Sequence, residues 1–148
     1  MIEIPTAKWR FLGDTANSKN YEIEPHVMAG VPNPGTRDDA VTARDNVAFQ
    51  NELLKEWGGG VVLVFFDNVV AQDKDARRIY QMEPEQPHFR ACGLVGGTLL
   101  SRAVMSFFVG LTKPRVPIKV FGSLADALQW ARAINGAAMA TAQENVAR

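Results

Sequence analysis

Six consecutive apolar residues at 61–66 (VVLVFF) constrain the fold of this chain more than any other feature. β-branched and aromatic side chains favour a strand, and the lack of alternation with polar residues indicates that both faces of the strand are buried. Such a strand belongs at the centre of a sheet whose two faces are covered. The stretch therefore predicts an α/β arrangement built around residues 61–66.

Alternating strand and helix patterns follow the central strand. Asp73 caps a predicted helix over 74–82, and further elements follow as a strand at 89–95, a helix at 99–111, a strand at 116–121 and a helix from Ser123 to Gly136. Upstream we expect strands at 6–12 and 21–28, a loop at 30–35, and a long helix from an N-cap at Thr36 to the glycines at 58–60. The pattern predicts one α/β domain over 1–148, with a mixed sheet of about four to five strands and a tail at 137–148.

Length and composition agree with a single globular domain. The chain has 148 residues, of which 47% are hydrophobic and 22% charged. No apolar run reaches the roughly 18 residues of a membrane span, and no basic and hydrophobic leader is present, so we expect a cytoplasmic protein. The single cysteine, Cys92, excludes an internal disulfide and a multi-cysteine metal site.

The charges are unevenly placed although the net charge is zero. Residues 1–88 carry 14 acidic and 9 basic side chains, whereas residues 89–122 carry five basic and no acidic ones: Arg90, Arg102, Lys113, Arg115 and Lys119. This stretch serves either an anionic ligand or acidic partner, or simply a solvated rim. Nucleic acid is not expected, because interleaved aromatics and a known motif are absent.

No catalytic arrangement of residues is recognisable in the sequence. His26 and His88 each stand beside a proline outside any motif, and Cys92 falls within a predicted strand, where a buried, inert thiol is usual. Asp67, Asp73 and Asp75 could bind Mg²⁺, but helix capping explains them more simply. We therefore expect a protein that is not an enzyme and that has no cofactor or metal.

A glycine turn that leads into the helix at 99–111 is the one suggestive feature. Free backbone N–H groups at Gly97 and Thr98, together with Ser101 and Arg102, could bind an anion. In the alternative interpretation Thr98 is only the N-cap and Arg102 covers the flank of the helix.

Over about residues 60–134 the chain resembles the bacterial SpoIIAA-like proteins, which have the STAS-type fold of anti-sigma-factor antagonists. The resemblance is carried by VVLVFF with DKDARRIY, by Gly97, Ser101-Arg102, FFVGL at 107–111, Lys113-Pro114 and Pro117, and by Phe121 with ALQW at 127–130. It implies a regulatory module that binds another protein. At the phosphorylated serine of those antagonists this chain has Lys74, after the matching Asp73, so phosphorylation there is not expected but a partner surface is.

Three functions remain open from the sequence. The leading one is a non-enzymatic protein-interaction or ligand-binding regulatory module, and the alternatives are a carrier of a lipid-like or apolar ligand and an unrecognised small enzyme. We also expect a homodimer that forms through the helix bearing Phe107 and Phe108 and through the adjoining segment from Lys113 to Pro117, because apolar residues on a helix flank often mark an interface.

Overall fold

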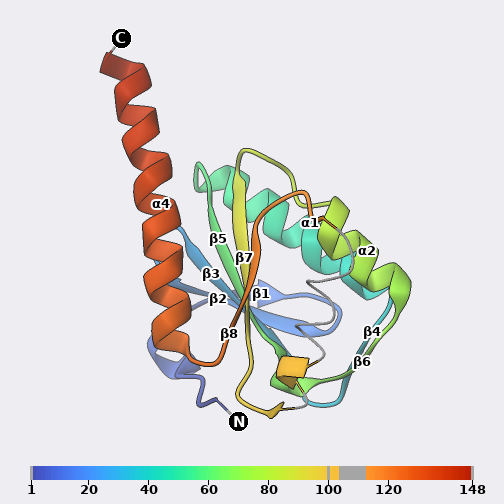
Figure 1. Ribbon diagram of the computed structural model, residues 1–148. Helices are drawn as coiled ribbons and strands as arrows, with labels where there is room; N and C mark the ends of the chain where they lie inside the picture. The colour runs from blue at the N-terminus through green and yellow to red at the C-terminus, as the bar shows by residue number, and fades with distance from the viewer. Residues whose placement is uncertain (1, 100, 104–112, 148) are drawn as a thin grey trace.

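The computed structural model describes residues 2–99, 101–103 and 113–147, and its core is a six-stranded mixed sheet (Figure 1). The strand order is β1-β2-β3-β5-β7-β8, and the bounds are Arg10–Asp14, Ser18–Glu24, Val27–Pro32, Gly60–Phe65, Phe89–Val95 and Ile118–Phe121. Strands β4 (Thr36–Asp38) and β6 (Val69–Gln72) form a separate two-stranded sheet. The helices are α1 (Ala40–Glu56), α2 (Lys74–Met82) and α4 (Leu124–Ala147), with short 3₁₀ turns η1 (Thr6–Lys8) and η2 (Phe66–Asn68). The α/β class with a mixed sheet is confirmed, but the expected four to five strands were too few.

The topology places α1 and α2 on one face of the sheet and α4 on the other (Figure 1). Strands β1, β2 and β3 are antiparallel, whereas β3, β5, β7 and β8 are parallel. Helix α1 lies in the crossover from β3 to β5, and α2 lies in the crossover from β5 to β7. Both crossovers lead to the neighbouring strand in the same direction across the sheet. Because such crossovers are right-handed, both helices lie on the same face.

Strand β5 is central and buried on both faces, as its sequence predicts. Val61, Leu63 and Phe65 pack in the core beneath α4, whereas Val62 packs on the side of α1 with Met28. All five side chains are at most 2% exposed. Because successive side chains of β5 point to opposite faces of the sheet, the strand contributes to two separate hydrophobic cores.

Helix α4 packs closely on the sheet because β7 has a glycine beneath it. A Cβ on Gly93 would lie 2.7 Å from Leu63 Cδ2 and 3.3 Å from the Trp130 ring. The Trp130 ring also packs on Phe121, with centroids 5.2 Å apart. Because residue 93 has no side chain, the Trp130 ring can approach the backbone of β7 closely.

The strand expected at 21–28 is in fact two strands. Residues Pro25 and His26 form a tight turn between β2 and β3, and His26 has a φ of 66°. This left-handed conformation is uncommon for a residue that is not glycine, so a turn centred on a histidine is hard to predict from the sequence. The expected loop at 30–35 is also wrong in its first part, because Gly30 lies inside β3.

The long helix begins later than expected. Thr36 lies in β4, and the N-cap of α1 is Asp39, whose carboxylate accepts a 2.9 Å hydrogen bond from the Thr42 amide. The Thr42 hydroxyl accepts in return from the Asp39 amide, which completes a capping box. This start leaves Thr36 and Asp38 in a strand, with both side chains buried.

The last helix does not end at Gly136. Helix α4 continues to Ala147 and projects past the sheet (Figure 1), so the tail expected at 137–148 is helical as far as Ala147. Its alanine-rich sequence after Gly136 favours a helix strongly enough to extend through one glycine. Of the helix expected at 99–111, residues 99 and 101–103 are helical, and 100 and 104–111 lie outside the described residues. None of the helices described is both long enough and apolar enough to cross a membrane.

Candidate functional site

A recessed cavity of about 50 Å³ lies between the sheet and the α1 and α2 helices. Its apolar lining comes mainly from β5 and β7 and includes Val64, Phe89, Cys92 and Leu94. Its polar lining comes from β2, β4, β6, α1, α2 and the turn before β2: Asn17, Asn20, Asp38, Asn46, Gln50, Gln72 and Tyr80. One wall is therefore unusually rich in amides for the interior of a small domain.

A buried carboxylate, Asp38, anchors the polar wall. Its side chain is 7% exposed and accepts hydrogen bonds from the Thr42 hydroxyl at 2.6 Å and from the Asn17 amide at 3.2 Å. The Gln72 amide lies 3.4 Å from its other oxygen. No lysine, arginine or histidine is among the described residues that line the cavity.

Asn46 and Tyr80 join α1 to α2 across the cavity. The Asn46 amide nitrogen donates to Asn17 Oδ1 at 2.8 Å and to the Tyr80 hydroxyl at 2.9 Å. Burial and the nearby Asp38 carboxylate raise the pKa of Tyr80, which also hydrogen-bonds with Asp38. Tyr80 therefore stays protonated at physiological pH.

Three amide groups on this wall have hydrogen-bonding atoms that no described residue uses. The Oε1 atom of Gln72 is buried and accepts no hydrogen bond from residues 2–99, 101–103 and 113–147, and in the same ranges no hydrogen bond of the Gln50 carboxamide occurs. Asn20 donates to Gly13 O at 3.3 Å, but in the same ranges its Oδ1 atom accepts nothing. Gln50 is 5% exposed and Asn20 is 2% exposed. A Cβ on Gly30 would lie 3.7 Å from Asn20 Oδ1 and 3.9 Å from Gln50 Nε2, so both amides reach the same side-chain-free spot on β3.

The donors expected to bind an anion are held by a carboxylate of the chain itself. Asp67 accepts from the amides of Gly97 at 3.0 Å and Thr98 at 3.3 Å, from the Ser101 hydroxyl at 2.7 Å and from the Ile2 amide at 3.1 Å. Burial alone would raise the pKa of Asp67, but these hydrogen bonds outweigh it and hold the pKa below its usual value. An external anion would have to displace Asp67 from this position.

Thr98 is also a helix cap, because its hydroxyl accepts from the Ser101 amide at 3.0 Å. Arg102 does not join this group: it is exposed, and its guanidinium lies beside Gly122. The structure thus brings Gly97, Thr98 and Ser101 together around Asp67 and leaves Arg102 at the surface.

The expected partner-surface residues are spread over the molecule. Asp73 caps α2 by accepting from the Ala76 amide at 2.8 Å, which confirms its capping role, and Lys74 is exposed in the first turn. Lys113 is exposed beside β8, and Phe107 and Phe108 lie outside the described residues. No group of three potential metal-binding side chains occurs in the described ranges.

Sequence reasoning missed the cavity, although one signal was present. Asn46 and Gln50 are four residues apart and therefore lie on one face of α1, the same face that buries Ala43, Val47 and Leu54. Buried polar side chains on an apolar helix face call for partners that the sequence itself cannot place.

A family model described as a domain of unknown function, DUF7793, matches residues 21–135. The match includes most of the cavity lining but not Asn17, Ser18 or Asn20. No curated protein and no solved structure matches the chain.

Proposed function

We propose that this chain, which belongs to the DUF7793 family of domains of unknown function, is a small-ligand-binding module whose ligand occupies the cavity beneath α1 and α2, between its apolar wall and its amide-rich wall. The observation that carries the proposal is the Oε1 atom of Gln72, which is buried in the cavity wall and has no hydrogen-bond partner among the described residues. A buried polar atom without a partner costs about 1–3 kcal/mol. A ligand that donates a hydrogen bond to this atom removes the cost.

The cavity selects the ligand by size. Its volume of about 50 Å³ exceeds the ~10–15 Å³ needed by one water molecule and is far below the ~300–1,000 Å³ of pockets for drug-sized ligands. The ligand therefore has only a few non-hydrogen atoms. This size disfavours the lipid-like ligand that the sequence left open.

The cavity also selects the ligand by charge. The side-chain oxygens of Asn20 and Gln72 face a site whose described lining holds the Asp38 carboxylate and no cationic side chain. Such a site favours N–H donors on a neutral or positively charged group, and it disfavours an anion. An amide, amidine or small amine has the required chemistry.

A regulatory rather than catalytic role is part of the proposal. The resemblance of residues 60–134 to SpoIIAA-like proteins supports it, because those proteins act by binding. The order of strands and helices over this range is compatible with that resemblance.

Three probes of the same shape test the proposal: acetamidinium, acetamide and acetate carry a positive, zero and negative charge. Thermal unfolding at increasing probe concentration should show stabilisation by acetamidinium and acetamide but not by acetate, since only a ligand that binds the folded state raises its stability. Side-chain amide signals of Gln50 and Asn20 should shift with the first two probes.

Matched variants make the test specific. Gln50→Leu should abolish the stabilisation, whereas Gln129→Leu, the same change at an exposed position of α4, should preserve it. Gln72→Met is a second cavity variant in case Gln50→Leu does not fold. Equal stabilisation by acetate, or an undiminished effect in both cavity variants, would refute the proposal.

A further inference from the structure

Strand β8 forms one outer edge of the six-stranded sheet. On its inner side the Cys92 amide donates to Pro117 O at 2.9 Å and the Gly96 amide to Phe121 O at 3.1 Å. In a parallel ladder alternate residues bond to the same neighbour. The backbone groups of Ile118 and Val120 therefore point away from β7, and no described strand pairs with them.

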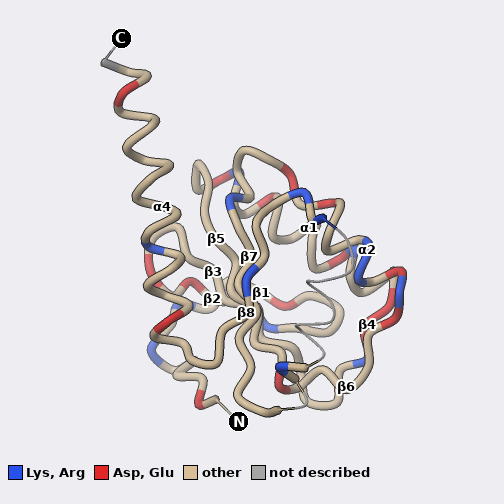
Figure 2. The backbone as a smooth tube through the Cα atoms, in the orientation of Figure 1, with Lys and Arg blue, Asp and Glu red and all other residues tan. Residues whose placement is uncertain are grey.

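The surface beside this edge is basic. A shallow hollow of about 530 Å³ is lined by residues 113–119 and by Trp130, and we call it the β8 groove. Lys113, Arg115 and Lys119 are exposed here, and Figure 2 shows basic but no acidic positions along the described chain from 113 to 121. The groove combines an open strand edge with three exposed basic side chains.

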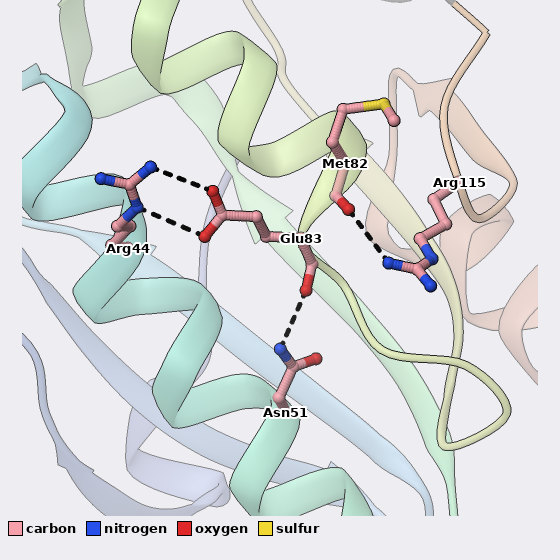
Figure 3. A network of polar contacts seen from close by, with 5 residues as sticks. All are labelled: Arg44, Asn51, Met82, Glu83 and Arg115. Atoms are coloured by element: carbon pink, nitrogen blue, oxygen red, sulfur yellow. Dashed lines mark hydrogen bonds and ion pairs between the residues drawn. The ribbon is translucent and has the colours of Figure 1, made fainter.

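The loop that leads into β8 is held in place by the end of α2. The Arg115 amide donates to Gln81 O at 2.8 Å, and its guanidinium lies 3.4 Å from Met82 O (Figure 3). Gln86 donates to Arg115 O at 3.0 Å, and the Val116 side chain is 1% exposed. A surface that is already ordered loses little conformational entropy when a partner binds.

The end of α2 is itself held by α1. Arg44 pairs with the Glu83 carboxylate at 3.4 Å, and the Asn51 amide donates to Glu83 O at 3.1 Å (Figure 3). Through Met82 and Glu83 the β8 groove is therefore connected to the main body of the domain.

We propose that the β8 groove docks an acidic, extended segment of a partner protein, which adds to the sheet as a strand beside β8. Backbone hydrogen bonds to Ile118 and Val120 supply the pairing, and acidic side chains meet Lys113 and Lys119. Nucleic acid is a poorer match, because its backbone offers no row of alternating N–H and C=O groups. The proposal does not depend on the cavity or its ligand.

The test uses a fluorescein-labelled ten-residue peptide of alternating Glu and Val, followed by fluorescence anisotropy. The double variant Lys113→Glu/Lys119→Glu should weaken binding at least tenfold. Lys55→Glu/Arg78→Glu has the same net charge at exposed positions of α1 and α2 and should change binding less than twofold. The same peptide with alternate backbone amides methylated keeps its charges and should bind at least tenfold more weakly.

Four results would overturn the proposal. Equal weakening of peptide binding by the two double variants would show that binding depends only on net charge. Full binding of the methylated peptide would exclude strand addition. Competition by duplex DNA with equal affinity would assign the surface to nucleic acid. A wild-type dimer that dissociates on Lys113→Glu/Lys119→Glu without peptide would assign it to a second copy of the chain.

Discussion

Adding one methyl group at Gly93 should destabilise the packing between the sheet and α4. In Gly93→Ala the new Cβ would lie 2.7 Å from Leu63 Cδ2, 3.3 Å from the Trp130 ring and 3.4 Å from the Phe121 ring. Carbon atoms pack at roughly 3.5–4.0 Å, so Leu63 must move by about 1 Å. Leu63 is fully buried beneath α4 and has no solvent to move into.

The net cost follows from two opposing effects. Overpacking of a core costs about 1–3 kcal/mol, and replacing glycine by alanine returns about 0.4–1 kcal/mol through the unfolded chain. We therefore expect a loss of about 1–2 kcal/mol in the free energy of unfolding. For a chain of this length the loss corresponds to a decrease in Tm of roughly 3–6 °C.

Urea denaturation of four proteins measures this effect: wild type, Gly93→Ala, Leu63→Val and the double variant. Leu63→Val removes the Cδ2 atom and should itself cost about 1 kcal/mol. In that background Gly93→Ala should cost less than about 0.5 kcal/mol, which gives a coupling near 1 kcal/mol. An unchanged or increased stability of Gly93→Ala, or the same loss in both backgrounds, would refute the packing argument.

Three other predictions concern separate parts of the molecule. Gly136→Ala should stabilise the outer part of α4 by up to about 1 kcal/mol, seen as slower amide exchange there, because a Cβ at this position meets nothing within 4 Å; faster exchange would contradict this. The lowered pKa of Asp67 stabilises the fold above its unfolded-state pKa of about 3.9, and this stabilisation is lost as pH falls through the folded-state pKa, so the difference in unfolding free energy between wild type and Asp67→Asn should shrink from pH 6 to pH 3; a constant difference would disprove it. Burial raises the pKa of Cys92 to about 12, so at pH 8 iodoacetamide should label the native protein far more slowly than the unfolded chain, and equal labelling rates would contradict the raised pKa.

The parts of the fold with strong local signals were predictable. The helix at 74–82 matches α2 at both ends, because Asp73 supplies the cap and prolines follow soon after. The strand at 89–95 matches β7, and the central strand is correct except that Phe66 begins η2. In each case the residues within and next to the element determine its secondary structure.

The predictions failed where contacts between residues far apart in the sequence determine the structure. No glycine beside His26 indicates the left-handed turn there. The His26 carbonyl accepts hydrogen bonds from distant residues, the Val61 amide of β5 and the Asn135 side chain of α4. The donors of Gly97 were visible in the sequence, but Asp67, which uses them, lies 30 positions away. The cavity was missed for the same reason, since Asn20 and Gln50 meet only through Gly30 of β3.

Helix α2 contributes to both the cavity and the β8 groove. Tyr80 lines the cavity, and the carbonyls of the next two residues, Gln81 and Met82, hold the Arg115 loop. If a ligand in the cavity moves α2, it changes the affinity of the groove for its partner. Thermodynamic linkage then requires that the partner change the ligand's affinity by the same factor, so either binding event would report on the other.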